Sequence, residues 1–187
     1  TNTLTISSGG SLTVAAVTIP QTVTSGSNLL DVGAGTLNAG NIDFTSTPGG
    51  AGHQLTISIG TATVSGNVTG IGASSTISFS GAGLLQLGGS MFSAATGTLT
   101  APSGTVEYNG AAQQVQALSY NNLILSGGGT KTLAAITTVG GNLTIVDGTT
   151  FNANNGLTVT GTTTVGGGIS GTITFTTLGT KIFVGLV

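Results

Sequence analysis

The amino-acid sequence predicts an all-β protein built as a parallel β-helix, or β-solenoid, with short strands and glycine-rich turns. Short units in which apolar and polar residues alternate recur along the chain, as in "LTI" at 4–6 and "LTV" at 157–159. Alternation with period 2 is typical of a strand with one buried face. Glycine makes up 34 of the 187 residues, and charged residues make up only 3%. The charges are too few to cover the exposed faces of helices, and the abundant Thr and Val favour strands.

The expected strands recur along the whole chain and are separated by glycine-rich turns. Leu, Ile, Val or Phe occupies the inward positions, and Thr occupies most of the outward ones. The units stand at 4–6, 12–14, 17–19, 55–57, 77–79, 143–145, 157–159 and 173–175, and the turn sequences include "SSGG", "GAG", "PGGAG", "SGGG" and "VGGG". Coils of about 20–25 residues would give a stack of about eight coils.

In the stretch 140–167, the alternation assigns each side chain to a face. The residues expected to face a narrow core are Leu143, Ile145, Leu157, Val159 and Val165. Those expected to face outward are Thr144, Thr158 and Thr164, and the chain is expected to turn at Gly148, Gly156 and Gly161. The stretch is slightly longer than one coil and contains one charged residue, Asp147.

Two alternatives to the β-helix remain open. An antiparallel β-sandwich is compatible with the hairpin-forming pairs "NG" at 109–110 and 155–156 and "DG" at 147–148. Disorder is compatible with the high content of Gly, Ser and Thr, although 38% of the residues are hydrophobic. The β-helix is favoured because the strands are short, the apolar residues are small, and no Trp is present to fill the wider gap between two sheets.

Residues 1–187 are expected to form a single β-solenoid domain, or one segment of a longer repetitive chain. With two cations and a formal net charge of −2, the chain cannot neutralise a nucleic-acid backbone, so nucleic-acid binding is not expected. No apolar run reaches the 18 or more residues of a transmembrane helix, so no membrane span is expected. Cysteine is absent, which is compatible with export.

Residues capable of catalysis are sparse, and the sequence predicts no enzyme and no cofactor. His53 is the one imidazole, and "PGGAGHQ" around it predicts a solvent-exposed loop rather than a catalytic triad. The charged residues are Asp31, Asp43, Glu107, Lys131, Asp147 and Lys181. Four scattered acids do not predict the paired carboxylates of a glycosidase.

Metal binding and covalent cross-linking are also not expected. Asp31, Asp43 or Asp147 could contribute to a calcium site, but each stands alone, and the calcium-binding nonapeptide repeat is missing. Asp147 is instead expected to shape a turn with Gly148. An isopeptide bond from Lys131 or Lys181 would need a buried lysine, whereas "GTKTL" places Lys131 beside a glycine-rich turn.

Thr-x-Thr pairs raise the alternative of an ice- or carbohydrate-binding module. A regular threonine array on a flat β-helix face can order water and bind ice. The pairs stand at 1–3, 3–5, 22–24, 61–63, 98–100, 130–132, 158–160 and 172–174. Because these intervals are irregular, the pairs are not expected to stay in register along one face. The carbohydrate alternative would make a surface glycan the ligand.

Residues 104–161 resemble a family of long, secreted bacterial β-strand-repeat proteins. The resemblance rests on "GTVEYNGAAQQVQALSYNNLILSGGGTKTLAAITTVGGNLTIVDGTTFNANNGLTVTG", and the rest of the chain shares only composition and rhythm with them. It implies a surface-exposed or secreted structural role, similar to that of an adhesin. It carries no functional residues to transfer.

Both ends of the sequence predict open sheet edges. "TNTLTI" begins directly as a strand, and in "TKIFVGLV" both faces look buried, so a pairing partner beyond the chain's own outer coil is expected. The predicted assembly-edge residues are Thr3, Leu4, Ile6, Ile182, Phe183, Val184 and Leu186. The leading hypothesis is therefore a self-associating extracellular or cell-surface structural protein: a fibre or surface-layer subunit, or the stalk of an adhesin.

Overall fold

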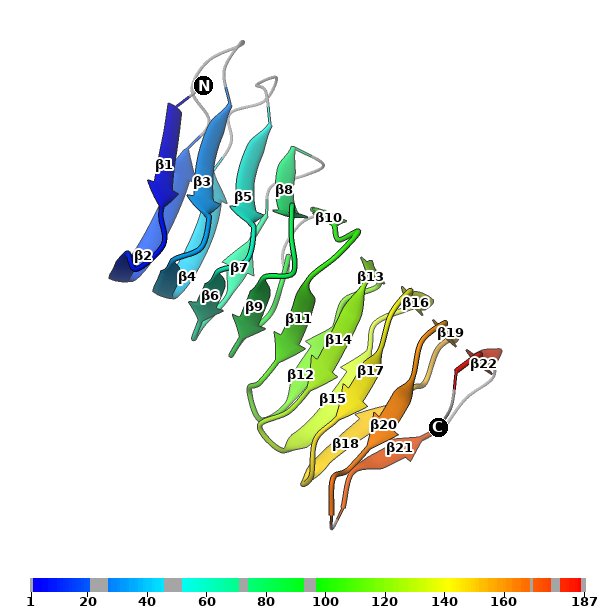
Figure 1. Cartoon of the computed structure of the whole chain (residues 1–187). Coiled ribbons are helices and arrows are strands. Elements are labelled where there is room, and N and C mark those ends of the chain that lie inside the picture. Colours follow the sequence, from blue (N-terminus) through cyan, green and yellow to red (C-terminus); the bar gives the residue numbers. More distant parts are fainter. Residues whose placement is uncertain are drawn as a thin grey trace. The chain divides into compact units, whose positions relative to one another are not determined.

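The computed structural model describes residues 2–20, 27–45, 52–70, 74–92, 97–168, 170–175 and 179–185. Within these ranges the chain is all-β, without a helix, and its parallel sheets stack as a β-solenoid of about seven turns (Figure 1). The predicted fold is confirmed, with about one turn fewer than expected. The antiparallel sandwich is wrong, because the described strand pairs are parallel. The chain divides into two compact units, Thr1–Gly104 and Thr105–Val187.

The N-terminal unit is built from strands that alternate between two sheets. Its strands are β1 (Asn2–Ile6), β2 (Ser11–Pro20), β3 (Asn28–Val32), β4 (Thr36–Thr45), β5 (His53–Ile57), β6 (Thr61–Val64), β7 (Val68–Thr69), β8 (Ser75–Phe79), β9 (Leu84–Leu87) and β10 (Thr98–Thr100). One sheet has the order β1-β3-β5-β8-β10, and the other contains β2-β4-β6-β9, with β7 paired to β4. Asn2 pairs with Asn28 and His53 with Ser75, so the turns of this unit differ in length.

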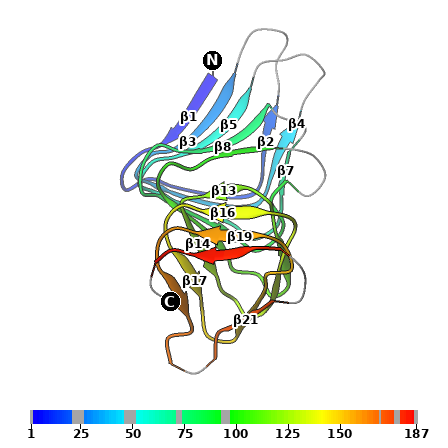
Figure 2. The ribbon, with the colours of Figure 1, turned by 90° about the vertical axis from the view of Figure 1, so that its right-hand side faces the viewer.

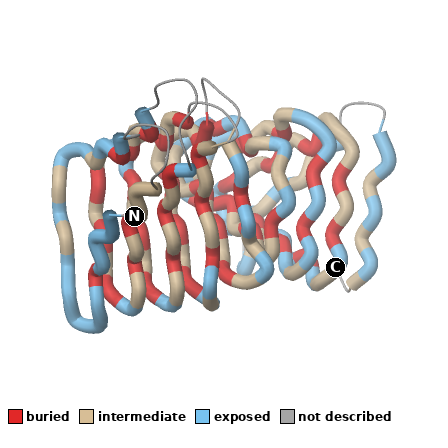
Figure 3. Tube along the Cα trace, turned by 90° about the horizontal axis from the view of Figure 1, so that it is seen from above, coloured by how far each residue is buried: buried red, intermediate tan, exposed pale blue. Residues whose placement is uncertain are grey.

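The core of the N-terminal unit consists of columns of similar aliphatic side chains. Leu30, Leu55, Ile77 and Leu99 occupy one column across four strands, and each is 9% exposed or less. The alternation of buried and partly exposed residues along each strand is visible in Figure 3. It confirms that the period-2 pattern of the sequence encodes the inward face.

The C-terminal unit has three sheets, and each turn contributes one strand to each of them. Its strands are β11 (Thr105–Tyr108), β12 (Gln113–Val115), β13 (Ser119–Tyr120), β14 (Asn122–Leu125), β15 (Gly129–Leu133), β16 (Thr137–Val139), β17 (Leu143–Ile145), β18 (Thr149–Asn152), β19 (Leu157–Val159), β20 (Thr163–Val165), β21 (Thr172–Thr174) and β22 (Lys181–Phe183). The orders are β11-β14-β17-β20, β12-β15-β18-β21 and β13-β16-β19-β22. Figure 2 shows β13, β16 and β19 side by side.

The expected faces of 140–167 are confirmed apart from one residue. Leu143, Ile145, Leu157 and Val159 are at most 1% exposed, and the predicted outward threonines are half-buried or exposed. Val165 is 36% exposed, so its predicted burial is wrong. It lies in β20, the last described strand of its sheet, and no further turn of the described chain covers it. Asp147 and Gly148 form the expected turn, which the Thr149 N–H closes by donating to the Val146 carbonyl at 3.1 Å.

Asparagine side chains link successive turns at one corner of each unit. Each Oδ1 atom accepts a hydrogen bond from a backbone N–H one turn later: Asn41 from Asn67 at 2.8 Å, Asn67 from Ser90 at 2.8 Å, Asn122 from Asn142 at 2.9 Å, and Asn142 from Thr162 at 2.9 Å. The residue before each donor is a glycine: Gly66, Gly89, Gly141 and Gly161. A Cβ at these glycines would lie 2.2 to 2.5 Å from the asparagine Oδ1. The glycine therefore makes room for the asparagine of the previous turn.

Candidate functional site

The N-terminal edge, defined as β1 and β2, has one side without a strand partner among the described residues. β1 pairs with β3, and β2 pairs with β4. The Asn2 N–H donates to the Ser27 carbonyl and the Ile6 carbonyl accepts from Gly33, both at 3.1 Å. Because backbone groups alternate in direction along a strand, those of Thr3 and Thr5 point away from β3. They are placed to pair with a further strand.

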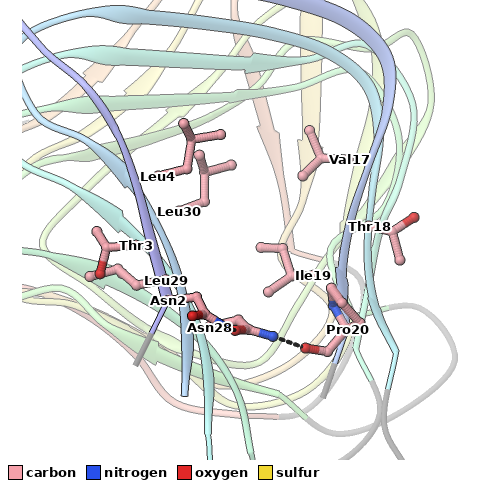
Figure 4. Close-up of a pocket in the computed structure, with 10 residues that line it drawn as sticks. All are labelled: Asn2, Thr3, Leu4, Val17, Thr18, Ile19, Pro20, Asn28, Leu29 and Leu30. Carbon is pink, nitrogen blue, oxygen red and sulfur yellow. Dashed lines mark hydrogen bonds between the residues drawn. The ribbon is translucent and has the colours of Figure 1, made fainter. Parts of the chain in front are cut away.

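A hollow of about 390 Å³ opens at this edge, between β1 and β3 on one side and the end of β2 on the other (Figure 4). Leu4 and Leu30 line it from one side, and Val17 and Ile19 line it from the other. Leu4 is 57% exposed, whereas Leu30, one turn later in the same column, is 3% exposed. The first turn therefore leaves core-type side chains uncovered.

Two asparagines form a polar rim beside this hollow. The Asn2 Nδ2 donates to the Asn28 Oδ1 at 3.0 Å, and the Asn28 Nδ2 donates to the Pro20 carbonyl. The rim ties the start of β3 to the end of β2 (Figure 4). It holds the two sides of the hollow in place while the Leu4 side chain stays exposed.

The C-terminal edge, defined as β20, β21 and β22, is the last described strand of each of the three sheets. The Leu157 N–H donates to the Thr180 carbonyl at 3.1 Å, and the Val184 N–H donates to the Val159 carbonyl at 2.9 Å. By the same alternation, the backbone groups of Phe183 point away from β19. This edge also presents an outward backbone.

Apolar side chains protrude at the C-terminal edge. Phe175, Ile182 and Val184 are 53%, 46% and 66% exposed. Ile182 occupies an outward column in which the preceding turns place Thr138 and Thr158. The rings of Phe175 and Phe183 pack edge to face at 6.2 Å, and the Lys181 Nζ lies 5.9 Å from the Phe175 ring centre.

The predicted assembly-edge residues divide into three groups. Thr3 and Leu4 are exposed at the N-terminal edge, whereas Ile6 is buried at 6% exposure. In the single chain Ile182 and Val184 are exposed and Phe183 is half-buried, so burial of both faces of the last strand would require the expected partner beyond the outer coil. Leu186 lies outside the described residues. The sequence reasoning missed Phe175, although its parity with Ile173 marked it as an inward side chain that needs a further turn to cover it.

Two of the Thr-x-Thr pairs, 130–132 and 172–174, lie on one sheet of the C-terminal unit, whereas 3–5, 61–63 and 98–100 lie on strands of the N-terminal unit. In the sheet β12-β15-β18-β21, one outward column contains Thr130, Thr150 and Thr172. The neighbouring column contains Thr132, Asn152 and Thr174. As expected, the described pairs therefore do not share one face, although the two on this sheet are in register. The intervals between Thr130, Thr150 and Thr172 differ because the two coils are unequal in length, yet the three residues stand in one column.

His53 is buried, and the prediction of an exposed loop histidine is wrong. It is the first residue of β5, is 0% exposed, and pairs in register with Ser75. Within the described residues, neither ring nitrogen has a hydrogen-bond partner. Burial lowers the pKa of His53 below its ordinary value of 6.5. A buried, unpartnered ring is placed as a core side chain.

Lys131 lies beside the glycine-rich turn as expected, but its side chain is buried, which was not expected. It occupies an inward position of β15 at 0% exposure. Its ammonium donates to the carbonyls of Gly110, of Ala111 at 3.0 Å and of Gly128 at 2.8 Å. Burial lowers the pKa of Lys131. The lysine thus ties two glycine-containing loops together.

The carboxylates are dispersed, and the described residues contain no group of three or more His, Cys, Asp or Glu able to hold a metal. The Asp147 Oδ1 accepts from the Gly167 N–H at 3.0 Å and the Ser170 N–H at 3.2 Å. The Glu107 Oε1 accepts from the Ser126 hydroxyl at 2.5 Å. A search of the described residues for an apolar helix long enough to cross a bilayer finds none.

The two tyrosines form a buried hydrogen-bonded pair that the sequence reasoning missed. The hydroxyls of Tyr108 and Tyr120 lie 3.0 Å apart, and the Tyr120 hydroxyl donates to the Gln116 carbonyl at 2.8 Å. Burial raises the pKa of Tyr108 to about 12. It also raises that of Tyr120 well above its ordinary value, with the neighbouring Tyr108 adding to the effect.

Comparison with protein families, with curated proteins and with solved structures finds no match to this chain. The site is therefore interpreted from its own geometry: two sheet edges with outward backbone groups and exposed apolar side chains, and one face with aligned threonines.

Proposed function

We propose that this chain is an extracellular structural protein that self-associates through its open sheet edges. It would act as a subunit of a fibre or surface assembly, or as the stalk of an adhesin-like protein. The observation that supports this most is the N-terminal edge, where Thr3 and Thr5 present an outward backbone beside the uncovered hollow lined by Leu4. Unpaired strand edges are templates for pairing with another chain.

The distribution of charge supports the same proposal. Natural edges are commonly blunted by lysine or proline, and the first strand, "NTLTI", contains neither. With charged residues at 3% of the chain, little repulsion opposes contact between copies. The resemblance of residues 104–161 to secreted bacterial repeat proteins supports an extracellular or surface location.

Sedimentation velocity and electron microscopy of the purified 187-residue chain test the proposal. We expect concentration-dependent oligomers or filaments. Leu4→Lys places a charge in the hollow and should weaken association by at least about ten-fold, because burying an unpaired charge is costly. Ile59→Lys is the matched control, since Ile59 is 68% exposed in the turn after β5 and should associate normally. A strictly monomeric chain at every concentration would refute self-association.

A second candidate function, ice binding, is favoured by the threonine columns on the sheet β12-β15-β18-β21. Apart from Asn152, the columns repeat hydroxyl and methyl groups at about 4.8 Å between strands and about 6.7 Å along a strand. An ice-recrystallisation assay tests it. Thr150→Lys, at the centre of one column, should abolish inhibition, and Thr158→Lys on another sheet should leave it intact. Carbohydrate binding has weaker support, because Phe175 is the only exposed aromatic side chain among the described residues.

A further inference from the structure

We propose that the partner of the N-terminal edge is the C-terminal edge of a second copy, so that copies join head to tail and not through like ends. This inference rests on the proposed self-association and adds its polarity. It assigns the occupant of the hollow beside Leu4: the rings of Phe175 and Phe183, which lie at inward positions of the last turn and pack against each other. Contacts between two different surface patches generate open chains of subunits.

The shapes of the two edges are complementary. The N-terminal edge is hollowed, with about 390 Å³ between Leu4 and Leu30 on one side and Val17 and Ile19 on the other. The C-terminal edge instead presents the rings of Phe175 and Phe183 at the end of its core, and Phe175 is 53% exposed. Two N-terminal edges would face each other across two hollows, and two C-terminal edges would meet on their projecting side chains. Only the unlike pairing fills the hollow.

The backbone favours the same pairing. Head-to-tail contact continues the parallel pairing that the described strands use throughout. Like ends related by a twofold axis would have to pair antiparallel. The lengths of the coils at the two edges are also similar. The interval from Leu157 to Lys181 in the last coil is longer than the interval from Leu143 to Thr163. The turns thus lengthen at the C-terminal edge toward the long first turn, which runs from Asn2 to Asn28.

The C-terminal edge carries the positive charge of Lys181, whereas the N-terminal edge contains no charged residue. Lys181 lies in β22 and is half-buried, and the other lysine of the chain, Lys131, is buried. Residues 1–104 contain Asp31 and Asp43 and no Lys or Arg. Asp31 lies on β3, next to the edge strand β1. Pairing two C-terminal edges would bring Lys181 of one copy toward Lys181 of the other, and these like charges repel. Unlike pairing instead brings Lys181 toward the N-terminal unit, whose formal charge is negative.

Two blocked variants test the polarity. The N-blocked variant carries Leu4→Lys and Thr5→Pro, and the proline removes an outward N–H without removing a bond to β3. The C-blocked variant carries Phe175→Lys, at an exposed inward position, and Phe183→Pro, which removes an outward N–H without removing a bond to β19. Thermal melts confirm that each variant folds, and Leu4→Lys with Thr3→Lys is a second N-blocked variant without a backbone change. Sedimentation velocity and native mass spectrometry follow each variant alone and the equimolar mixture.

Head-to-tail joining predicts that each variant alone is monomeric, with self-association at least about ten-fold weaker than that of the unchanged chain. The mixture should form a one-to-one heterodimer, because it contains one intact edge of each kind. Homodimers of either single variant, with no heterodimer in the mixture, would overturn the polarity but leave the proposed self-association standing. If the unchanged chain itself does not associate, both proposals fail.

Discussion

His53 illustrates, at the scale of single residues, how a polar side chain enters the core of this fold. It shares inward parity with Leu55 and Ile57 in β5, and all three are 0% exposed. The strand places every second side chain inside, whatever its polarity. A neutral ring satisfies this position better than a charged one, because a charge taken out of water needs a partner.

We predict that the chain loses stability as the pH falls below 6.5, the ordinary pKa of histidine. Because burial lowers the pKa of His53, the unfolded chain takes up a proton there that the folded chain does not. The loss is at most about 1.4 kcal/mol per pH unit below that value. Urea denaturation between about pH 5 and 7 measures it, in a range that lies above most carboxylate titration. His53→Leu should remove the slope, and an unchanged slope would show that His53 is not its source.

Lys131 stabilises two loops by hydrogen bonds to three backbone carbonyls. We predict that Lys131→Met lowers the free energy of unfolding by about 1–3 kcal/mol, because the carbonyls lose their donor. The control is the same substitution at the half-buried Lys181, which should cost less than about 1 kcal/mol. Chemical denaturation of the two variants compares them, and equal costs would contradict a structural role for Lys131.

Tyr108 and Tyr120 are the only tyrosines of the chain, so their absorbance reports on one place in the C-terminal unit. We predict no ionisation near pH 10 in the folded protein, since burial raises both pKa values, that of Tyr108 to about 12. The unfolded chain releases these protons earlier, so stability falls as the pH rises above about 10. Ultraviolet titration of phenolate measures the shift, and Tyr120→Phe should raise the pKa of Tyr108 further, because the hydrogen bond with Tyr120 lowers it.

At the residue level, the sequence predicted which side chains of a strand point inward, but it did not predict the polar partners that surround them. The alternation correctly placed Leu143, Ile145, Leu157 and Val159 inside, because hydrophobic burial follows the strand period. It also marked Lys131, which shares parity with the buried Leu133, but its charge pointed to solvent. Two of the carbonyls that hold the lysine come from a loop of the previous coil, and a local pattern carries no information about them.

At the scale of the strand and turn, neighbouring coils are coupled at the Gly–Asn corner, where an asparagine Oδ1 accepts from the backbone of the next coil beside a glycine. We predict that Gly141→Ala costs about 1–3 kcal/mol, because its Cβ would lie 2.5 Å from the Asn122 Oδ1. Gly140→Ala is the adjacent control. Its nearest contact would be the Tyr120 carbonyl at 3.7 Å, so the change should be within about 0.5 kcal/mol of neutral.

A double-mutant cycle identifies the source of the cost. In the Asn122→Ala background, Gly141→Ala should cost about 1 kcal/mol less, since the Oδ1 atom is gone while the Asn121 carbonyl at 3.0 Å remains. Chemical denaturation supplies the four free energies. Strict additivity would contradict a contact between these two side chains.

Strands and turns were predictable as elements, because alternation and glycine clusters are local signals. Their register was not. The threonine pairs at 130–132 and 172–174 share two columns because the unequal coils between them return the chain to the same face, which the intervals alone did not indicate. The hairpin pair Asp147-Gly148 forms a turn, but between strands of different sheets, because β17 and β18 each pair with strands of other coils.

At the scale of the whole molecule, acid and alkali are expected to act on different units. His53 lies in the N-terminal unit, and both tyrosines lie in the C-terminal unit. The single methionine, Met91, is buried in the N-terminal unit. We predict that the native methyl resonance of Met91 weakens first on acidification, and that native tyrosine ring resonances weaken first in alkali. Loss of both sets together at either extreme would mean that the two units unfold as one.

The Gly–Asn corner also allows the solenoid to be lengthened by whole coils. In the C-terminal unit, Leu123 pairs with Leu143 and Leu143 with Thr163, so two successive turns have the same length. A duplicated segment of that length would bring its own glycine to accommodate the asparagine before it and its own asparagine to bond the turn after it. Such duplication adds length without requiring new side-chain chemistry. An insertion of half a coil would instead leave one asparagine without its backbone donor and one glycine without the asparagine beside it.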